Sequence, residues 1–278
     1  MAGKARINKI LRYVIVLVGA WIMLYPILWM ISSSLKPLNL IFKDLSLIPS
    51  QLTLDNYIKG WKGSGGTSFG RYYINSFVLV FFAMAGNALS CSLAAFAFAR
   101  LRFKGKNILF GLMMVTLMIP LHVLVIPQYI MFTKLHWMNT ILPIVVPKFF
   151  ATDAFFIFLM VQFIRGIPRD LDEAATIDGC SVYMLFVKII YPLMVPALVT
   201  TLIFTFMWTW NDFFTQMLYT SNADHFTVTL ALRMFMDAEE SATGSFFAMS
   251  SLSLIPIFLM FLFFQKYLVE GIATTGIK

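Results

Sequence analysis

Charged residues are scarce in this chain of 278 residues, of which only 12% are Asp, Glu, Lys or Arg. A soluble domain usually carries about 25% charged residues, and a disordered chain combines low hydrophobicity with high net charge. Here 60% of the residues are hydrophobic and the mean hydropathy is +0.82. The composition therefore excludes a soluble enzyme and a disordered chain, and it indicates that the chain folds in lipid.

Cysteine and histidine are also rare. Two cysteines, Cys91 and Cys180, are too few for a disulfide framework. The three histidines, His122, His136 and His225, form no Cys/His cluster with the spacing of a metal site. We therefore expect no disulfide, no bound metal and no cofactor in this chain.

Acidic residues are fewer than basic ones, 13 against 21, which gives a net charge of +8. A basic protein can bind nucleic acid, but here the basic residues fall between long uncharged stretches and form no stripe on a polar domain. Basic residues in such positions orient membrane proteins. We expect no nucleic-acid partner.

Long stretches without any charged residue are abundant. A helix of about 20 apolar residues crosses the roughly 30 Å of hydrocarbon in a bilayer. Five uncharged stretches are long enough: Tyr13–Leu35, Tyr72–Ala99, Asn107–Thr133, Ile189–Asn211 and Ser241–Gln265. A sixth, Ile141–Ile164, contains Lys148 and Asp153 but is otherwise apolar. The sequence thus predicts an all-α polytopic membrane protein with six transmembrane helices and both chain ends on one side.

The basic residues beside these stretches predict the orientation. Thirteen of the 21 fall on one face: Lys4, Arg6, Lys9, Arg12, Arg100, Arg102, Lys104, Lys106, Arg165, Arg169, Lys188, Lys266 and Lys278. The positive-inside rule makes that face, with the N- and C-termini, cytoplasmic. The first stretch is longer than the apolar region of a signal peptide and lacks a small-residue cleavage site, so we expect an uncleaved anchor.

Three loops are expected on the outer face. Lys36–Arg71 is the longest, and its glycine-rich turn lacks the Lys-Ser/Thr ending of a nucleotide-binding P-loop. Lys134–Thr140 is short. The third loop runs from about Phe214 to Gly244, and Thr227–Met236 within it is expected to form a short interfacial helix.

The residues of the cytoplasmic loop 165–191 predict a helix–turn–helix. Pro168 is favourable in a first helical turn. Three acidic residues place negative charge at the positive end of that helix: Asp170, Asp172 and Glu173. Gly179 can adopt the left-handed conformation that ends a helix. Ser181 can cap a second helix, which Pro192 would end.

The expected apolar side of this helix–turn–helix consists of Leu171, Ile177 and Phe186. The carboxylates would then face a partner at the cytoplasmic surface.

This loop resembles the EAA loop of the membrane-spanning subunits of bacterial ABC importers. The matching residues are Glu173-Ala174-Ala175, Asp178-Gly179, Phe186, Ile189, Pro192 and Pro196. Cys180 stands where a small Ala is more usual. Shorter matches elsewhere narrow the resemblance to carbohydrate-importing permeases of the maltose and multiple-sugar type: Ser33-Ser34-Leu35-Lys36-Pro37, Asn56-Tyr57, Asn75-Ser76, Trp210-Asn211-Asp212-Phe213, Gly271 and Gly276-Ile277-Lys278.

The resemblance implies that residues 1–278 form one permease domain with the type I ABC importer transmembrane fold. It implies that loop 165–191 is a coupling helix seated in a cytoplasmic ATP-binding subunit. Glu173 would pair with a basic residue there, Ala174 and Ala175 would allow close approach, and Gly179 would permit the bend; Asp178 and Ser181 belong to the same motif.

The implied partners are a second homologous permease subunit, two ATP-binding subunits and an extracytoplasmic solute-binding protein in a bacterial cell membrane. The chain has no Walker A sequence, so ATP and Mg would be bound by the partner ATPase subunits and this chain would not be an enzyme. The implied cargo is a sugar or oligosaccharide.

Polar residues inside the expected spans are candidates for the substrate pathway, because ionisable groups at bilayer depth are costly. The candidates are Asp153, Asn87, Gln128, Asn211 and Asp212. For Asp153 an interhelical hydrogen bond without ligand contact is an equal alternative. Lys148 is expected to extend towards the outer surface, and its spacing makes it a poor helical partner for Asp153.

Aromatic residues near the spans allow two interpretations. Trp208, Trp210 and Tyr219 could stack on a sugar, but we favour a place in the interfacial aromatic belt. Pro120 and Pro127 are expected to break or kink the third span.

Three other functions are weighed against transport driven by ATP. A secondary transporter driven by an ion gradient is the main alternative, although such proteins commonly show paired repeats and none is evident here. A membrane-embedded enzyme would need a cluster of catalytic residues, which the sequence lacks. A scaffold subunit would leave the EAA-like loop without a purpose.

Overall fold

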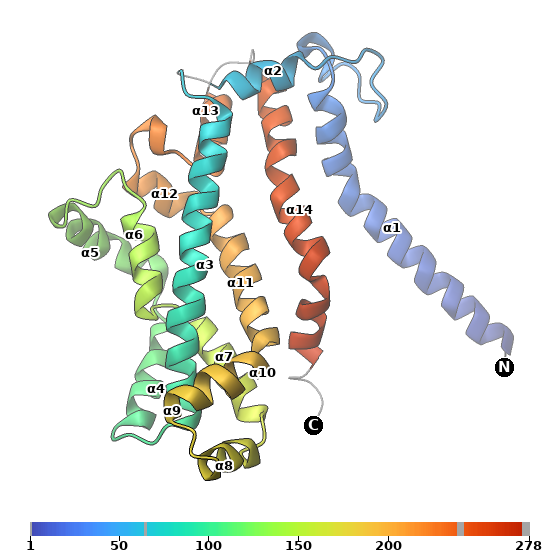
Figure 1. Cartoon of the computed structure of the whole chain (residues 1–278). Coiled ribbons are helices and arrows are strands. Elements are labelled where there is room, and N and C mark those ends of the chain that lie inside the picture. The colour runs from blue at the N-terminus through green and yellow to red at the C-terminus, as the bar shows by residue number, and fades with distance from the viewer. Residues whose placement is uncertain (1, 64–65, 238–241, 274–278) are drawn as a thin grey trace. The chain divides into compact units, whose positions relative to one another are not determined.

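The computed structural model describes residues 2–63, 66–237 and 242–273, and it is all-α over these ranges, with no strand in them (Figure 1). The fold class expected from the apolar stretches is confirmed. By their internal contacts the residues divide into two compact units, one of residues 1–71 and 231–255 and the other of residues 72–230 and 256–278. Residues Gly276-Ile277-Lys278 of the sequence motif, and Ser241 at the expected start of the last span, lie outside the described residues.

The first unit contains α1 (Ala2–Ser34), η1 (Leu38–Leu40), α2 (Asp55–Lys62), most of α13 (Val228–Asp237) and the first part of α14 (Thr243–Ala273). Between Asn8 and Ser34, helix α1 is apolar and none of its most apolar window is buried. An apolar helical stretch that buries nothing against its own chain suits a lipid environment, and among the side chains of α1 that the structure describes, only those at its end, Ser32, Ser33 and Ser34, are buried.

A polar cluster holds the segment after α1 in place. The side chain of Lys36 is fully buried, and its ammonium group donates to the carbonyls of Asp44 (2.5 Å) and Ser46 (2.7 Å). The Asn56 amide donates to the carbonyls of Ser34 and Lys36, both at 2.8 Å. Lys36 and Asn56, two residues of the short sequence motifs, therefore hold this segment through hydrogen bonds to its backbone.

The second unit is built around α3 (Phe69–Arg100), α7 (Ala154–Gly166) and α11 (Val195–Trp210). Its buried core draws on each of these helices and on η3 (Leu185–Ile190), a π-helix. The largest contributors pack side by side: Phe96, Phe156, Met160, Phe186, Ile190 and Met194. This core packs the end of α3 against α7. Loop 165–191 begins at the end of α7.

Four helices of the described residues are long and apolar enough to cross a membrane: Asn8–Ser34, Phe69–Arg100, Leu142–Gly166 and Thr243–Lys266. A fifth crossing is possible if Val182–Leu193 and Val195–Trp210, bent by 73°, form one broken span. The expected count of six transmembrane helices is therefore not confirmed in the described residues.

The third expected span, Asn107–Thr133, is broken into two helices. It consists of α4 (Lys106–Thr116) and α5 (Leu121–Lys134), which Pro120 separates by adopting an extended conformation before α5. Eleven residues of helix extend only about 16 Å, about half of a bilayer core. The break expected at Pro120 is thus confirmed, whereas Pro127 lies inside α5.

The fourth span is interrupted as well. It begins with α6 (Leu142–Val145) and the 3-10 helix η2 (Val146–Phe150), after which Ala151 adopts a left-handed conformation with φ of 53°. Helix α7 starts only at Ala154. On the expected third outer loop, α12 (Phe214–Tyr219) and η4 (Ala223–His225) precede α13, which confirms the short helix expected at Thr227–Met236.

Candidate functional site

Loop 165–191 forms the predicted helix–turn–helix. Helix α8 (Asp170–Ile177) carries its three acidic residues in the first turn. It ends where Gly179 adopts a left-handed φ of 76°, and the amide of Cys180 donates to the Ala175 carbonyl at 2.9 Å. The Ser181 hydroxyl accepts from the Met184 amide at 3.3 Å and caps the next segment, α9 (Val182–Met184). Figure 1 places α8 at the end of the second unit where α3 finishes.

Two details of the loop differ from expectation. Pro168 precedes α8 instead of occupying its first turn. Pro192 does not end the second helix, because helical structure continues through η3 and α10 (Tyr191–Leu193) and breaks at Met194. The residues before Pro192 form a π-helix, whose wider turn relieves the clash between a proline ring and the carbonyl four residues earlier.

The predicted apolar side of the loop is wrong for two of its three residues. Phe186 packs into the core, 5.1 Å from the ring of Phe96. Leu171 is 41% exposed and Ile177 is 86% exposed. Helix α8 instead turns Ala175 inward, which is 5% exposed. The inward face also carries Asp172, whose carboxylate forms an ion pair. Leu171 and Ile177 are six positions apart, about 120° around an ideal helix, so they do not share one face.

The remaining motif residues lie on the surface of the loop. Glu173, Ala174, Asp178, Gly179 and Ser181 are exposed. A Cβ at Gly179 would meet nothing within 4 Å. The outer face of α8 therefore presents free carboxylates and small residues, and Ala175 is the motif member that packs against the chain itself.

Arg100, the last residue of α3, lies under this loop, and the sequence reasoning gave it only a topological role. Its Nε lies 3.1 Å from Asp172 Oδ2, and its Nη2 donates to the Ile167 carbonyl at 2.8 Å. A basic residue at the end of an apolar helix has many uses, so no sequence signal distinguishes Arg100 from its neighbours.

Of the five pathway candidates, the structure brings Asn87 and Asp153 together. Asn87 is fully buried in α3, and its amide donates to Asp153 Oδ2 (2.6 Å) and to the Thr205 hydroxyl (3.0 Å). The interhelical hydrogen bond expected as one alternative is present. Thr205 on α11 completes this polar cluster and was missed, because a lone threonine in an apolar helix carries no signal.

Lys148 also joins this cluster, and the expectation of a poor pair is wrong. Lys148 Nζ lies 2.8 Å from Asp153 Oδ2 and 3.1 Å from Oδ1. The expectation assumed one continuous helix. The left-handed Ala151 breaks that helix and turns Asp153 back towards Lys148.

The other three candidates bond to residues outside the set. Gln128 on α5 accepts from the Tyr219 hydroxyl at 3.4 Å. Asn211 is exposed and donates to the Met207 carbonyl. Asp212 accepts from the amide and the hydroxyl of Thr215 in the first turn of α12. The contacts of Asn211 and Asp212 are local in sequence, whereas the contact of Gln128 joins α5 to α12.

Of the three aromatic residues considered for a sugar contact or an interfacial belt, two are buried and one is exposed. Trp210 is 2% exposed and stacks on Phe206 with ring centroids 5.6 Å apart, and Tyr219 is 3% exposed. The preferred placement in a lipid-facing belt is therefore wrong for these two. Trp208 is 51% exposed and suits a belt or a contact with another subunit.

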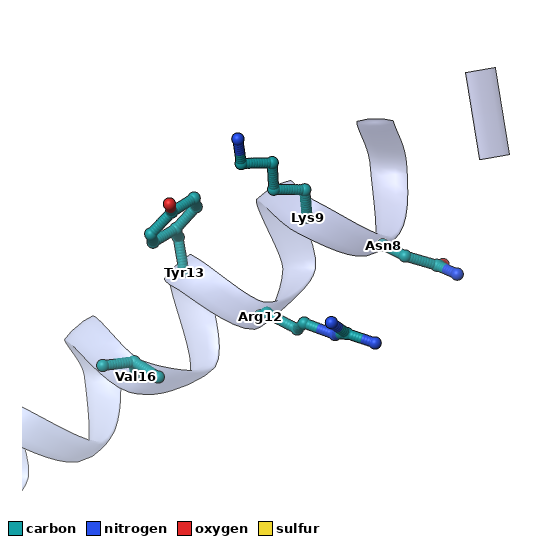
Figure 2. Close-up of a pocket in the computed structure, with 5 residues that line it drawn as sticks. All are labelled: Asn8, Lys9, Arg12, Tyr13 and Val16. Atoms are coloured by element: carbon teal, nitrogen blue, oxygen red, sulfur yellow. The ribbon is translucent and has the colours of Figure 1, made fainter. Parts of the chain in front are cut away.

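A hollow of about 700 Å³ lies along α1, lined by Asn8, Lys9, Arg12, Tyr13 and Val16. Figure 2 shows that all five side chains come from this one helix. It is therefore a helix surface between side chains and not an enclosed site. In the described part of the chain no group of three His, Cys, Asp or Glu residues is placed to hold a metal ion.

Comparisons with known proteins agree with this architecture. Residues 86–274 match the family described as binding-protein-dependent transport system inner membrane component. The arabinooligosaccharides transport system permease protein AraQ of Halalkalibacterium halodurans is 33% identical, over 93% of this chain and 92% of that protein. The trehalose transport system permease protein SugB of Mycobacterium tuberculosis is 33% identical, over 92% of each chain.

A third relative, the multiple sugar-binding transport system permease protein MsmG of Streptococcus mutans, is 31% identical over the full length of both chains. Among solved structures, a chain of a bacterial ABC transporter involved in the import of the acidic polysaccharide alginate matches with a TM-score of 0.84 and 22% identity. That match covers 94% of this chain and 96% of the other, and it shows the fold of an ABC importer permease. The chain therefore belongs to the family of inner-membrane components of binding-protein-dependent transport systems.

Proposed function

We propose that this chain is the membrane-spanning permease subunit of an ATP-driven importer for a sugar or oligosaccharide. The observation that carries the proposal is α8, a short helix with free carboxylates that ends in a left-handed Gly179 on a chain that is otherwise apolar. The sugars in the names of several relatives support the cargo class. Both compact units belong to one permease domain in this proposal, and the family match across residues 86–274 supports that.

The outer face of α8 docks into a cytoplasmic ATP-binding subunit. Glu173 and Asp178 offer carboxylates to basic residues of that subunit, and Ala174 allows close approach. Gly179 and the Ser181 cap hold the bend. Ala175 has a different task from the one first expected, since it packs α8 against its own chain. Closure of the ATPase subunits then moves α8 as a rigid body.

The complete importer contains a second, different permease subunit and two ATPase subunits, which bind ATP and Mg. An extracytoplasmic binding protein delivers the sugar to the outer loops, and both termini of this chain are cytoplasmic. Thirteen of 21 basic residues on that face support the orientation.

Asp153 is the pathway candidate with the strongest support, because its ion pair with Lys148 is about one quarter exposed. Asn87 is fully buried and contributes through its hydrogen bond to Asp153. Their mutual hydrogen bond equally supports a packing role. An ion-gradient transporter remains the alternative function, and the carboxylates of α8 would have no partner in it.

The test is purification of the complex through a tag on this chain, followed by reconstitution in liposomes with a panel of oligosaccharides. We expect an ATPase to co-purify and uptake to require ATP at the cytoplasmic face, unaffected by ionophores. Glu173→Arg should remove the ATPase from the purified complex, whereas Asp55→Arg, the same charge change on the exposed start of α2, should not. Uptake abolished by an ionophore and indifferent to ATP would contradict the proposal.

A further inference from the structure

Arg100 carries a buried charge at a place where α3 meets loop 165–191. Its side chain is only 3% exposed. Taking a guanidinium out of water is costly unless charged or polar groups surround it. Two nearby basic residues that follow α3, Arg102 and Lys104, are exposed. The topology rule accounts for those neighbours, but it does not require any of them to be buried.

The guanidinium contacts both segments that join at the loop. Nη2 donates to the carbonyl of Ile167, which lies between the end of α7 and Pro168. Nε lies 3.1 Å from Asp172 Oδ2 in the first turn of α8, as an ion pair without the alignment of a hydrogen bond. A planar guanidinium can hold two partners in different directions at once, which a lysine ammonium on a flexible stem does less well.

Asp172 depends on this contact. Its carboxylate is 19% exposed, and its second oxygen, Oδ1, is buried without a hydrogen-bond partner among the described residues. Loss of Arg100 would therefore remove the positive charge that pairs with this carboxylate. Asp172 and the buried Ala175 lie three residues apart on one face of α8, and Glu173, Ala174 and Asp178 lie on the exposed side. The ion pair thus sets the rotation of α8 about its axis.

We propose that Arg100 is a positioning residue that ties loop 165–191 to α3, so that a displacement of α8 moves α3 with it. This inference rests on the proposed function, because it names the contact through which the movement of α8 reaches a membrane-spanning helix. Helix α3 also carries Asn87, whose amide holds Asp153 and Thr205. The movement of α8 is therefore delivered to the helix that organises the polar cluster inside the spans.

The chain offers a probe on the loop itself. Cys180 lies directly after Gly179 and is partly exposed, whereas Cys91 is fully buried. A thiol-reactive nitroxide attached to Cys180 in the complete complex in lipid nanodiscs reports the mobility of the loop. The Cys180→Ser complex, labelled in the same way, provides the background from the partner subunits.

Arg100→Gln is compared with Arg102→Gln, which removes the same charge from an exposed residue two positions away. In the absence of nucleotide, we expect Arg100→Gln to make the Cys180 label more mobile. We also expect it to lower the transport ratio, defined as the sugar transported per ATP hydrolysed, about tenfold or more. The KM for ATP should stay within about twofold of the wild-type value. Arg102→Gln should leave both quantities unchanged. Arg100→Lys keeps the charge for topology and should give an intermediate transport ratio.

The double variant Arg100→Gln/Asp172→Asn completes the test. If Arg100 acts through its contact with Asp172, the second substitution removes nothing more, so the transport ratio should be no lower than that of Arg100→Gln alone. Equal label mobility and equal transport ratio in Arg100→Gln and Arg102→Gln would overturn the positioning role. If the Arg100→Gln protein does not accumulate, Arg100→Lys takes its place. An Arg100→Lys complex with wild-type label mobility and a wild-type transport ratio would also overturn the positioning role. Failure of the proposed function would give a different result. No ATPase would then co-purify with this chain, and MgATP would not change the mobility of the Cys180 label in the wild-type protein.

Discussion

Lys148 Nζ lies 2.8 Å from Asp153 Oδ2, although five positions along an ideal helix would point the two side chains in different directions. The pair forms because Ala151, between them, adopts a left-handed φ of 53° and ends the 3-10 helix η2. An apolar span therefore contains two charges that neutralise each other, and Asn87 from α3 donates to the same carboxylate oxygen. The break at Ala151 thus brings together the residues of the polar cluster, Lys148, Asp153 and Asn87.

Removing either charge of this pair is expected to destabilise the protein. Lys148→Met leaves Asp153 with an uncompensated charge and should lower the free energy of unfolding by about 1–3 kcal/mol, less than for a fully buried pair because both side chains are about one quarter exposed. Asp153→Asn should cost a similar amount. The measurement is the thermal unfolding midpoint of the purified protein in detergent.

The double variant Lys148→Met/Asp153→Asn is the control for this prediction. It leaves no unpaired charge, and the amide oxygen that replaces the carboxylate can still accept from the Asn87 amide. Its loss of stability should therefore be clearly smaller than the sum of the two single losses. If the loss in the double variant equalled the sum of the two single losses, the two side chains would not interact.

Helix α3 passes very close to the broken segment at Gly86. A Cβ there would lie 2.9 Å from Lys148 Cβ and from Phe149 Cδ2, and 3.0 Å from the Lys148 backbone carbon. Gly86→Ala should therefore lower stability by about 1–3 kcal/mol through overpacking. Gly111→Ala in α4, where nothing lies within 4 Å, should instead raise stability by about 0.5–1 kcal/mol through helix propensity. Equal unfolding midpoints for the two variants would contradict the close packing.

Much of the fold could be predicted because the relevant signals are local. Long uncharged stretches predict helices in lipid, Pro120 predicts a break, and Gly179 with Ser181 predicts the turn and cap of loop 165–191. Each of these acts within a few residues through the backbone, so the sequence alone is sufficient.

The remaining features depend on contacts between distant segments. Ala151 has no sequence preference for a left-handed conformation, so the break in the fourth span could not be predicted. The face that α8 turns inward carries Asp172, which pairs with Arg100, 72 positions earlier in the chain, whereas Leu171 and Ile177 are exposed. Periodicity describes an isolated helix, whereas a buried ion pair from another helix decides which face is turned inward.

Gly179 offers a test of the loop geometry in which a new side chain meets no other group of this chain. Its φ is 76° and a Cβ would meet nothing within 4 Å, so a substitution there acts through the backbone. Gly179→Val should cost about 1–2 kcal/mol in the left-handed conformation, which corresponds to about a tenfold loss of the native turn. Gly179→Asn should be milder, because asparagine tolerates this conformation.

The measurement for Gly179 is sugar uptake per molecule in the membrane. Gly166→Ala, at the end of α7 with equally open surroundings, is the matched control and should keep wild-type uptake. A Gly179→Val protein with full uptake would show that the left-handed turn is unnecessary for transport.

Lys36 is the clearest single determinant of the segment after α1. Its buried ammonium holds the carbonyls of Asp44 and Ser46. Lys36→Met therefore leaves the Asp44 carbonyl without this donor, at a cost of about 1–3 kcal/mol, whereas the Ser46 carbonyl keeps the hydrogen bond from the Ser32 hydroxyl. We expect this variant to be cut by chymotrypsin between residues 38 and 54 much faster than wild type. Lys43→Met, which removes an exposed charge from the same segment, should be cut at the wild-type rate.

The pH dependence of this cleavage tests the same segment independently. Hydrogen bonds from the side chain of Ser46 and from Ser50 hold the pKa of Asp44 well below its ordinary value of 3.8. Because the folded-state pKa is lowered, the contribution of Asp44 to stability is complete above pH 3.8 and is lost only as the pH falls below that value. Resistance to a protease that is active in acid, such as pepsin, should therefore be constant from about pH 6 down to about pH 4 and decline below it. In Asp44→Asn the decline should be absent, because the side chain no longer titrates, and an equal decline in wild type and Asp44→Asn would assign it to another group.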